Sequence, residues 1–305
     1  MANTDRPGRA WSSRYRRALL PLATLAVVAG LQACSLATRF AYNHADWLVQ
    51  REIEKFVELT AQQETRFEHW FAQQWDWHRS TQLPDYARFL RSAAAAAAGP
   101  LSSEQLAAFM QQLDDFGESV EARIATGVIS FCAELNHEQV QELAQTLADR
   151  EQEFYEDYVQ APESERRQDT AKRMRSTLRK RYGRLSDAQT QLVNDWAQQR
   201  RDLAPLWHQR QQQWRTQWLL LLQERQSADF AERAAQLLFN SEADWPPELT
   251  QGAAENLQLW NQLLSNVHNI SSDKQRQSLV QLLLDYAEDA EALAPSIEQA
   301  ETSAY

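Results

Sequence analysis

The chain has 305 residues, a formal net charge of −11 and only seven glycines. Glycine averages about 7% of protein residues, and so few glycines argue against hairpin-rich folds, phosphate-binding loops and dinucleotide-binding turns. The acidic balance argues against general nucleic-acid binding. Residues that favour helices (Ala, Leu, Gln, Glu and Arg) dominate the composition, so we expect an all-α protein.

The segment Arg16–Cys34 has the plan of a secretory signal: two arginines, roughly 14 apolar residues, a small residue and then a cysteine. A membrane-spanning helix needs about 20 apolar residues, and the polar Gln32 closes the run early. The end of the segment resembles a bacterial lipobox, in which Cys34 becomes the lipid-bearing first residue. We therefore predict a cleaved signal peptide over residues 1–33 and a lipid-anchored domain over residues 34–305.

In lipoproteins of Gram-negative bacteria, an aspartate after the lipid-bearing cysteine retains the protein at the inner membrane. Ser35 stands at this position, so the resemblance implies an outer-membrane anchor and a domain that faces the periplasm. Residues 1–33 hold five arginines and one aspartate, and without them the chain has 26 basic and 41 acidic residues, a net charge of −15. The predicted contact with the membrane is through the lipid on Cys34, and no nucleic-acid partner is expected.

A short pattern recurs along the chain: an apolar residue, then Ser, Thr or Asn, then Gln three residues after the polar residue. In a capping box the polar side chain accepts from the N3 amide, and the Gln side chain accepts from the cap amide. Each copy therefore predicts a helix start. The predicted pairs are Thr60–Gln63, Ser102–Gln105, Asn136–Gln139, Ser186–Gln189 and Ser272–Gln275.

Between these starts the apolar residues keep helical spacing, and the longest stripe runs without interruption from Leu106 to Leu135. Each predicted helix has one apolar face, which is typical of helices that pack as a bundle. We expect an elongated bundle of long amphipathic helices, as one domain or as two subdomains divided near residues 160–166.

Proline and glycine indicate where these helices are interrupted. The alanine tract 93–98 is closed by Gly99 and Pro100, which predicts a helix end. Pro162 separates two helices, and Pro84 and Pro205 predict kinks or short breaks. The sequence Trp245-Pro246-Pro247 predicts the longest internal loop. The residues from about Ser296 are expected to fray.

Three segments carry a resemblance to known proteins: Phe40–Leu48, Trp77-His78-Arg79 with Leu83–Ala87, and Arg181–Ser186 with Trp196 and Leu203–Trp207. In these segments the chain resembles a family of uncharacterised, all-helical lipoproteins of Gram-negative proteobacteria, grouped as a domain of unknown function. This resemblance implies a helical fold and an envelope location, and it supplies no reaction, ligand or catalytic residue.

No catalytic or metal-binding motif stands out, so we expect no enzyme activity, no metal and no cofactor. The spacing Glu134-x-x-His137 is the one match to a helical metal motif, but it straddles a predicted helix start. Cys132 follows Phe131 in an apolar stripe, which favours a buried and inert thiol over a reactive one.

Two groups of residues form candidate interaction surfaces. Tyr42, Asn43 and Asp46 either cap and anchor the first helix or recognise something at the membrane surface, and His78 either makes a structural hydrogen bond or a functional contact. Residues 166–184 carry nine basic residues and one acid, and they include Arg173, Arg179, Lys180 and Arg181. This segment either pairs with the acidic stretch 142–165 or binds anionic headgroups, lipopolysaccharide phosphates or an acidic partner.

The tryptophans give a further alternative. Trp207, Trp214 and Trp218 share a helix face, as do Trp70 and Trp77, whereas Trp75 is expected to be exposed. Aromatic residues at this spacing form a core or an aromatic-lined groove.

Two functions follow as hypotheses. The first is a non-catalytic protein-binding, chaperone-like or scaffold role in the envelope. Leu59–Gln63 also resembles the L-T-x-x-Q motif of small periplasmic stress chaperones, although a capping box alone would produce it. The second hypothesis is binding of anionic lipid or lipopolysaccharide through residues 166–184 and an aromatic groove.

Overall fold

The computed structural model describes residues 39, 40, 42–239 and 245–295, and the regular elements in this part are helical. They are α4 (Ala45–Glu54), α5 (Ala61–Trp77), a π-helical turn η2 (His78–Gln82), α6 (Leu83–Ala97), α7 (Ser103–Ala133), α8 (His137–Tyr158), α9 (Glu163–Tyr182), α10 (Asp187–Gln199), α11 (Ala204–Gln223), α12 (Phe230–Phe239), α13 (Pro247–Asn269) and α14 (Asp273–Leu293). The all-α prediction is confirmed.

Several predictions fall outside the described residues. These are the signal peptide over residues 1–33, the lipid-bearing Cys34 and the fraying tail from Ser296. Within the described ranges, no helix is both long and apolar enough to cross a membrane.

All five predicted capping boxes form, at the starts of α5, α7, α8, α10 and α14. In each box the cap side chain accepts from the backbone N–H of the Gln, and the Gln side chain accepts from the cap N–H. The box of Thr60 and Gln63 therefore gives a structural role to the L-T-x-x-Q segment. Its threonine and glutamine are both engaged in starting α5.

Four of the capping glutamines also pair across helices. Gln139 Nε2 donates to Gln63 Oε1 at 2.7 Å, and Gln63 Nε2 donates back to Gln139 Oε1 at 3.2 Å. Gln275 and Gln189 make the same reciprocal pair, at 2.9 and 3.4 Å. The two pairs join the start of α5 to that of α8, and the start of α10 to that of α14. The glutamines that cap these helices therefore also hold together helix ends that are far apart in the sequence.

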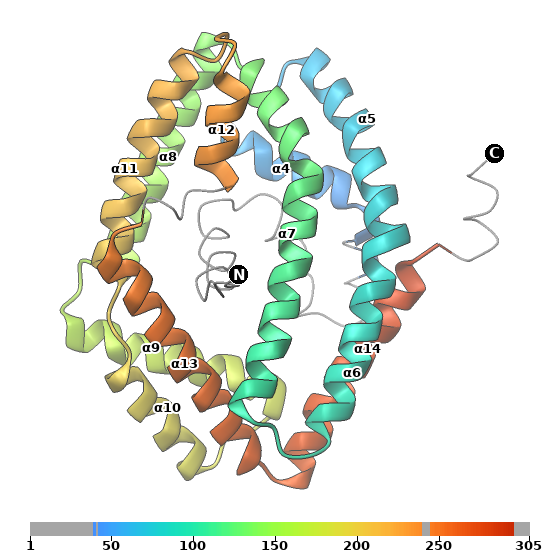
Figure 1. Cartoon of the computed structure of the whole chain (residues 1–305), viewed down its shortest axis with the longest axis vertical. Coiled ribbons are helices and arrows are strands. Elements are labelled where there is room, and N and C mark those ends of the chain that lie inside the picture. The colour runs from blue at the N-terminus through green and yellow to red at the C-terminus, as the bar shows by residue number, and fades with distance from the viewer. Residues whose placement is uncertain (1–38, 41, 240–244, 296–305) are drawn as a thin grey trace, which may run out of the picture.

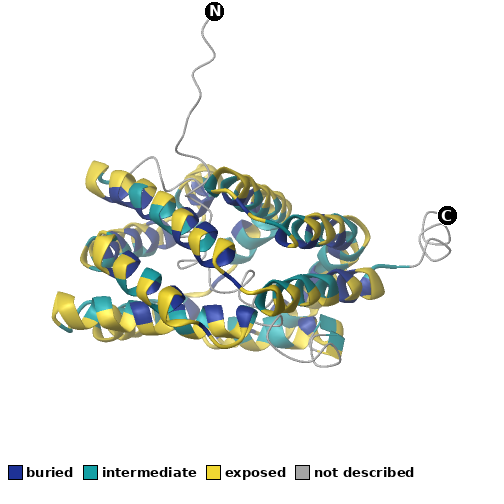
Figure 2. Ribbon diagram, turned by 90° about the horizontal axis from the view of Figure 1, so that it is seen from below, coloured by how far each residue is buried: buried dark blue, intermediate teal, exposed yellow. Residues whose placement is uncertain are grey.

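The helices form a closed frame (Figure 1), with α8, α11 and α12 on one side and α5, α6 and α14 on the other. Helices α9, α10 and α13 lie at the lower end, and α7 runs the length of the frame as the single helix that its apolar stripe predicted. Helix α6 packs along α14, α7 packs against α13 and α12, and α8 packs against α11. Buried residues gather on the helix faces that meet neighbouring helices (Figure 2).

Helix ends follow the predicted breaks. Helix α6 ends at Ala97, ahead of Gly99 and Pro100. Pro162 immediately precedes α9, and Pro205 lies in the first turn of α11. Pro246 precedes α13, while much of the predicted loop before it lies outside the described residues.

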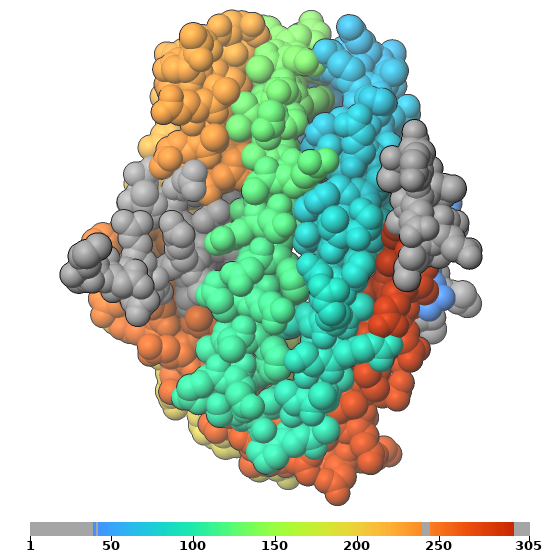
Figure 3. Space-filling view, turned by 45° about the vertical axis from the view of Figure 1, so that its right-hand side comes forward, coloured from blue at the N-terminus to red at the C-terminus, as the bar shows by residue number. Residues whose placement is uncertain are grey.

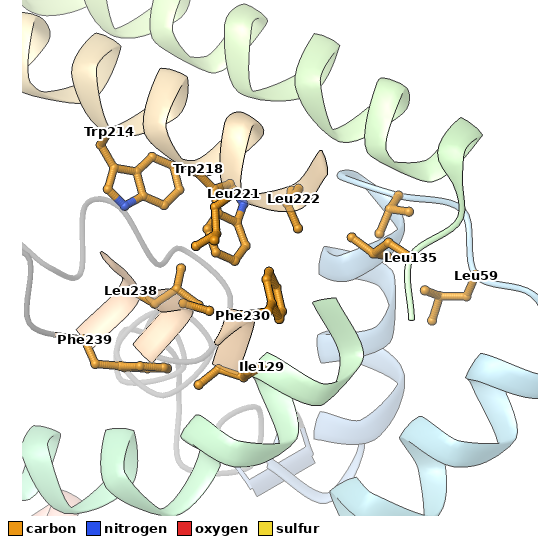
Figure 4. Packing of buried hydrophobic residues seen from close by; sticks show 12 residues of the cluster. Leu59, Ile129, Leu135, Trp214, Trp218, Leu221, Leu222, Phe230, Leu238 and Phe239 are labelled. Carbon is orange, nitrogen blue, oxygen red and sulfur yellow. The ribbon is translucent and has the colours of Figure 1, made fainter. Parts of the chain in front are cut away.

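The largest apolar cluster lies between α7, α11 and α12 (Figure 4). Trp214 and Trp218 stack there with ring centroids 6.1 Å apart, and both are buried. Trp207 is buried in a separate cluster around Leu203. All three tryptophans of this stripe are buried, and Trp214 and Trp218 also line the cavity described below.

Trp75 contradicts its prediction of exposure. Its ring stacks on Phe71 with centroids 5.2 Å apart, and it meets Tyr42 at 4.3 Å. Helix α5 is covered on two faces because both α4 and α7 pack against it. A side chain that lies off one apolar face of α5 is therefore still covered by the other neighbour.

Candidate functional site: an apolar cavity with a polar corner

A cavity of about 1220 Å³ lies between the helices of the frame. Its wall is formed by residues of α4, α5, α6, α7, α8, α11, α12 and α14. Protein interiors leave few voids larger than a water molecule, which needs about 10–15 Å³. A cavity two orders of magnitude larger is therefore too large to be a packing defect.

The wall is mainly apolar. Helix α7 contributes Val120, Ile124 and Val128, one helical turn apart, and these side chains are only half-buried because one side of each faces the cavity. Helix α5 contributes Phe67 and Phe71, and other wall residues come from the cluster in Figure 4, namely Trp214, Trp218 and Leu238. Such a surface favours an apolar occupant, since each apolar Å² removed from water contributes about 25 cal/mol.

One corner of the wall is polar and centres on His78, which is 5% exposed. Its Nδ1 lies 2.8 Å from the Tyr42 hydroxyl, its ring stacks on Trp75 with centroids 5.4 Å apart, and Tyr86 meets it edge-on. Burial lowers the pKa of His78 to about 4, so the ring is neutral near pH 7. Within the part of the chain that the structure describes, the buried Nε2 has no hydrogen-bond partner. This nitrogen therefore has capacity for one further hydrogen bond at the cavity wall.

The π-helical turn explains how His78 reaches this corner. The Leu83 N–H donates to the His78 carbonyl, five residues earlier, and Pro84 has no N–H to continue α-helical bonding. The irregularity expected at Pro84 is therefore this π-helical turn. Single π-helical turns are rare and are frequent at functional sites.

Two further contacts hold residues from the start and the end of the described chain beside the same corner. Asp289 of α14 is buried and accepts from Arg39 Nε at 2.8 Å. Arg79 Nε donates to the Leu293 carbonyl at 3.0 Å. The segment before α4 is thus held to the turn η2 by Tyr42 and to α14 by Arg39.

The solvent-exposed residues of the cavity wall lie along the seam between α5 and α7, on the face shown in Figure 3. Every wall residue that is exposed to solvent belongs to one of these two helices or directly follows α7. They are Arg66, Gln73, Ala122, Arg123, Thr126, Ser130 and Glu134.

Two contacts close this seam. The Trp70 indole rests on Gly127, where a Cβ would lie 2.2 Å from the indole Nε1. The Arg123 guanidinium lies 5.6 Å from the Trp77 ring centroid. Only glycine lets α5 and α7 approach in this way, so an interior glycine of a long helix has a clear structural purpose here.

Residues 55–250 match a family of unknown function, DUF6279. The chain belongs to this family. No curated protein and no solved structure matches it. The expected membership of a family of unknown function is confirmed, whereas lipid anchoring and a proteobacterial envelope location stay predictions.

The DUF6279 match covers the π-helical turn, the α5–α7 seam and two of the three segments that carried the family resemblance. The segment Phe40–Leu48 and helix α14 lie outside it. The cavity wall is therefore built from the family segment together with residues on both sides of it.

The structure brings together only part of the Tyr42, Asn43 and Asp46 cluster. Tyr42 anchors the helix through His78, as expected, but Asn43 and Asp46 are exposed and do not line the cavity. The expected capping by this cluster is wrong, because α4 begins without a side-chain cap hydrogen bond.

The basic helix α9 does not pack along the acidic helix α8, so the predicted side-by-side arrangement is wrong. The two stretches do share an ion pair, between Glu163 and Arg167 in the first turns of α9. Helix α9 packs against α10 and α14. In α8, Glu151 accepts from Arg215 of α11 at 2.8 Å. Adjacency along the chain did not become adjacency in space.

The candidate cations of α9 have different surroundings. Arg181 is half-buried and donates to the Thr177 carbonyl, while Arg173 lies 5.0 Å from the Tyr158 ring centroid. Arg179 and Lys180 are exposed. These side chains lie apart from the polar corner of Tyr42 and His78, so they do not form one site with it.

Cys132 is half-buried in the cavity wall. Its apolar surroundings raise the thiol pKa to about 12, which keeps the sulfur protonated and unreactive. Glu134 follows α7 and His137 begins α8, so the Glu-x-x-His spacing does straddle a helix start. Among the described residues, no group of three or more His, Cys, Asp or Glu side chains is placed to hold a metal ion.

Proposed function

We propose that this chain is a non-catalytic, lipid-anchored binding protein of the outer membrane that holds an acyl-chain-bearing molecule in its periplasm-facing domain. The observation that carries the proposal is the apolar cavity of about 1220 Å³. Ligand sites in proteins usually have about 300–1,000 Å³ and a largely apolar wall. This cavity slightly exceeds that range, which suits a long or branched aliphatic molecule.

The polar corner narrows the chemistry of the occupant. His78 is neutral and offers a single unpaired ring nitrogen inside an apolar wall. An ester, amide or hydroxyl group could hydrogen-bond to that nitrogen, whereas a buried charge without a partner would be costly. The geometry therefore favours aliphatic chains linked through an uncharged polar group.

A protein partner and a chaperone-like role remain the other hypothesis from sequence. An unfolded polypeptide carries a backbone donor and acceptor at almost every residue, and a buried wall must satisfy them. The cavity wall offers few such groups, so it suits a lipid better than a peptide. A protein partner would instead contact the outer surface.

A cavity-filling substitution tests the proposal. Ile124→Trp on α7 places a larger side chain in the cavity, while Glu118→Trp adds the same group at an exposed position of α7. We expect the first variant to bind the uncharged methyl ester of dansyl-undecanoic acid at least about tenfold more weakly, a change of about 1.4 kcal/mol. The second variant should bind like the native chain.

Fluorescence titration of the dansyl group gives the affinities, and melting temperatures verify that both variants fold. Absence of saturable binding to the native chain would contradict the proposal. Equal weakening by both tryptophans would place the probe outside the cavity.

Helix α9 supplies a second candidate, binding of an anionic lipid surface. Lys172, Arg179, Lys180 and Arg184 are exposed, and none has an ion pair among the described residues. A basic residue near an anionic membrane contributes about 1 kcal/mol. We expect Arg179→Glu with Lys180→Glu to weaken vesicle binding of an unacylated Cys34→Ser chain about tenfold or more.

Cosedimentation with vesicles that contain phosphatidylglycerol measures this effect, and added salt should abolish it. Arg88→Glu with Lys274→Glu makes the same charge change on α6 and α14 and should have less effect. Equal losses in both double variants would assign the binding to net charge and not to α9.

A further inference from the structure

The helical segment that starts the described chain has apolar residues on two opposite faces. Its inner face, with Ala45, Val49 and Ile53, lines the cavity. Its outer face exposes Phe40 and Trp47, whose exposed fractions are 65% and 56%. Within α4, Trp47 and Arg51 are four residues apart and share this outer face. The segment therefore separates the cavity from the surroundings of the protein on this side.

The outer face is an ordered stripe. Phe40 stacks on His44 with ring centroids 4.1 Å apart. One turn further along, Trp47 is followed by Arg51, whose guanidinium lies 5.4 Å from the Trp47 ring centroid. His44 is a turn residue that immediately precedes α4, and backbone hydrogen bonds from His44 to Phe40 and from Leu48 to His44 span this turn. Aromatic rings beside a long cationic side chain are typical of helices at a bilayer surface.

The position of this stripe in the chain points to the same partner. Phe40 follows the predicted lipid-bearing Cys34 by six residues. Six extended residues span at most about 20 Å, so a lipid on Cys34 would keep Phe40 near the bilayer surface. The area also fits: an aromatic side chain buries about 150–250 Å², so two of them supply less than the roughly 800 Å² per partner of a stable protein interface.

We propose that the outer face formed by Phe40, His44, Trp47 and Arg51 lies in the headgroup region of a phospholipid bilayer. The helix then separates the bilayer from the apolar cavity. This proposal rests on the lipid anchor of the proposed function, and it does not depend on what the cavity holds.

A site-specific probe tests this contact in the acylated chain. His44→Cys in a Cys132→Ser background accepts a bimane dye between the two aromatic side chains, and both of these remain in place. The protein is reconstituted into vesicles of phosphatidylethanolamine and phosphatidylglycerol, with and without nitroxide-labelled lipid. We expect the lipid nitroxide to quench this dye several-fold more than a dye at Gln145→Cys, an exposed position on α8.

Serine substitutions separate insertion from mere proximity to the anchor. Phe40→Ser with Trp47→Ser removes two exposed side chains and should reduce quenching at position 44 to the level at position 145. Leu220→Ser removes an apolar side chain that is similarly exposed, at 58%, from α11 and should leave quenching unchanged.

Three outcomes would overturn the proposal. They are equal quenching at positions 44 and 145, quenching that survives the double serine change, or crosslinking of two copies through position 44 without quenching. The mass of the N-terminal peptide reports acylation of Cys34 separately. The Ile124→Trp variant should keep the quenching, so failure of the cavity proposal is distinguishable.

Discussion

The Gln189→Ala variant is expected to unfold at a midpoint about 5 °C below that of the native chain, a loss of about 3 kcal/mol in the free energy of unfolding. Gln189 is fully buried. Its Oε1 accepts from the Ser186 N–H, and its Nε2 donates to the Ser271 hydroxyl at 2.9 Å and to the Val267 carbonyl at 3.2 Å. Alanine would leave the Ser186 N–H without its acceptor, remove the pair with Gln275 and open a void between α10 and α13. The Ser271 hydroxyl would keep its bond to the Val267 carbonyl.

The matched control is Gln105→Ala, which removes the same side chain from the same motif at an exposed position. Water can replace its bond to the Ser102 N–H, so we expect a loss below about 1 kcal/mol. Thermal unfolding followed by circular dichroism compares the two variants. Equal losses would mean that the contacts of Gln189 with other helices contribute nothing beyond helix capping.

The helix starts could be predicted because capping is local. Ser186 and Gln189 meet within three residues, and no other part of the chain is needed to form the box. The partner of each glutamine could not be predicted, because the pair of Gln189 and Gln275 depends on how α10 and α14 meet in space. The same applies to α8 and α9, whose opposite charges suggested a pair that the packing of α8 on α11 replaces.

The cavity could not be predicted either. Val120, Ile124 and Val128 recur at the spacing of a buried helix face, and a face that lines a cavity has the same period. Hydrophobic spacing shows which side of α7 avoids water, but it does not show how far away the opposite wall lies. A signal was present in Gly117 and Gly127, since a glycine inside a long helix indicates close approach by another group.

Among the candidate residues named from the sequence, His78 is the one whose surroundings the structure defines most fully. The sequence predicted a structural hydrogen bond, and the Tyr42 hydroxyl makes it. Pro84 predicted an irregular helix but not a π-helical turn, because the same residue also permits a simple kink. The unpaired Nε2 depends on the surrounding wall and therefore appears only in three dimensions.

The neutral state of His78 predicts acid sensitivity. Burial lowers its pKa from 6.5 to about 4, so between these values the unfolded chain binds a proton that the folded chain does not. Stability rises with pH wherever the unfolded state binds more protons. The contribution of His78 is therefore complete above pH 6.5 and is lost as pH falls to 4, by about 3 kcal/mol at about 1.4 kcal/mol per pKa unit.

Replacement of His78 by glutamine isolates this effect, because Gln keeps a polar side chain but does not titrate. Other groups add to the acid slope in both chains: burial lowers the pKa of His268, and Arg91 lowers that of Glu291. The free energy of unfolding of the native chain, minus that of His78→Gln, should therefore fall by about 3 kcal/mol from pH 7 to pH 4 in urea titrations. His69→Gln removes an exposed histidine from α5 and is the matched control. A constant difference between the native chain and His78→Gln would show that the ring is protonated as readily in the folded chain as in the unfolded one, and the polar corner would then be open to water.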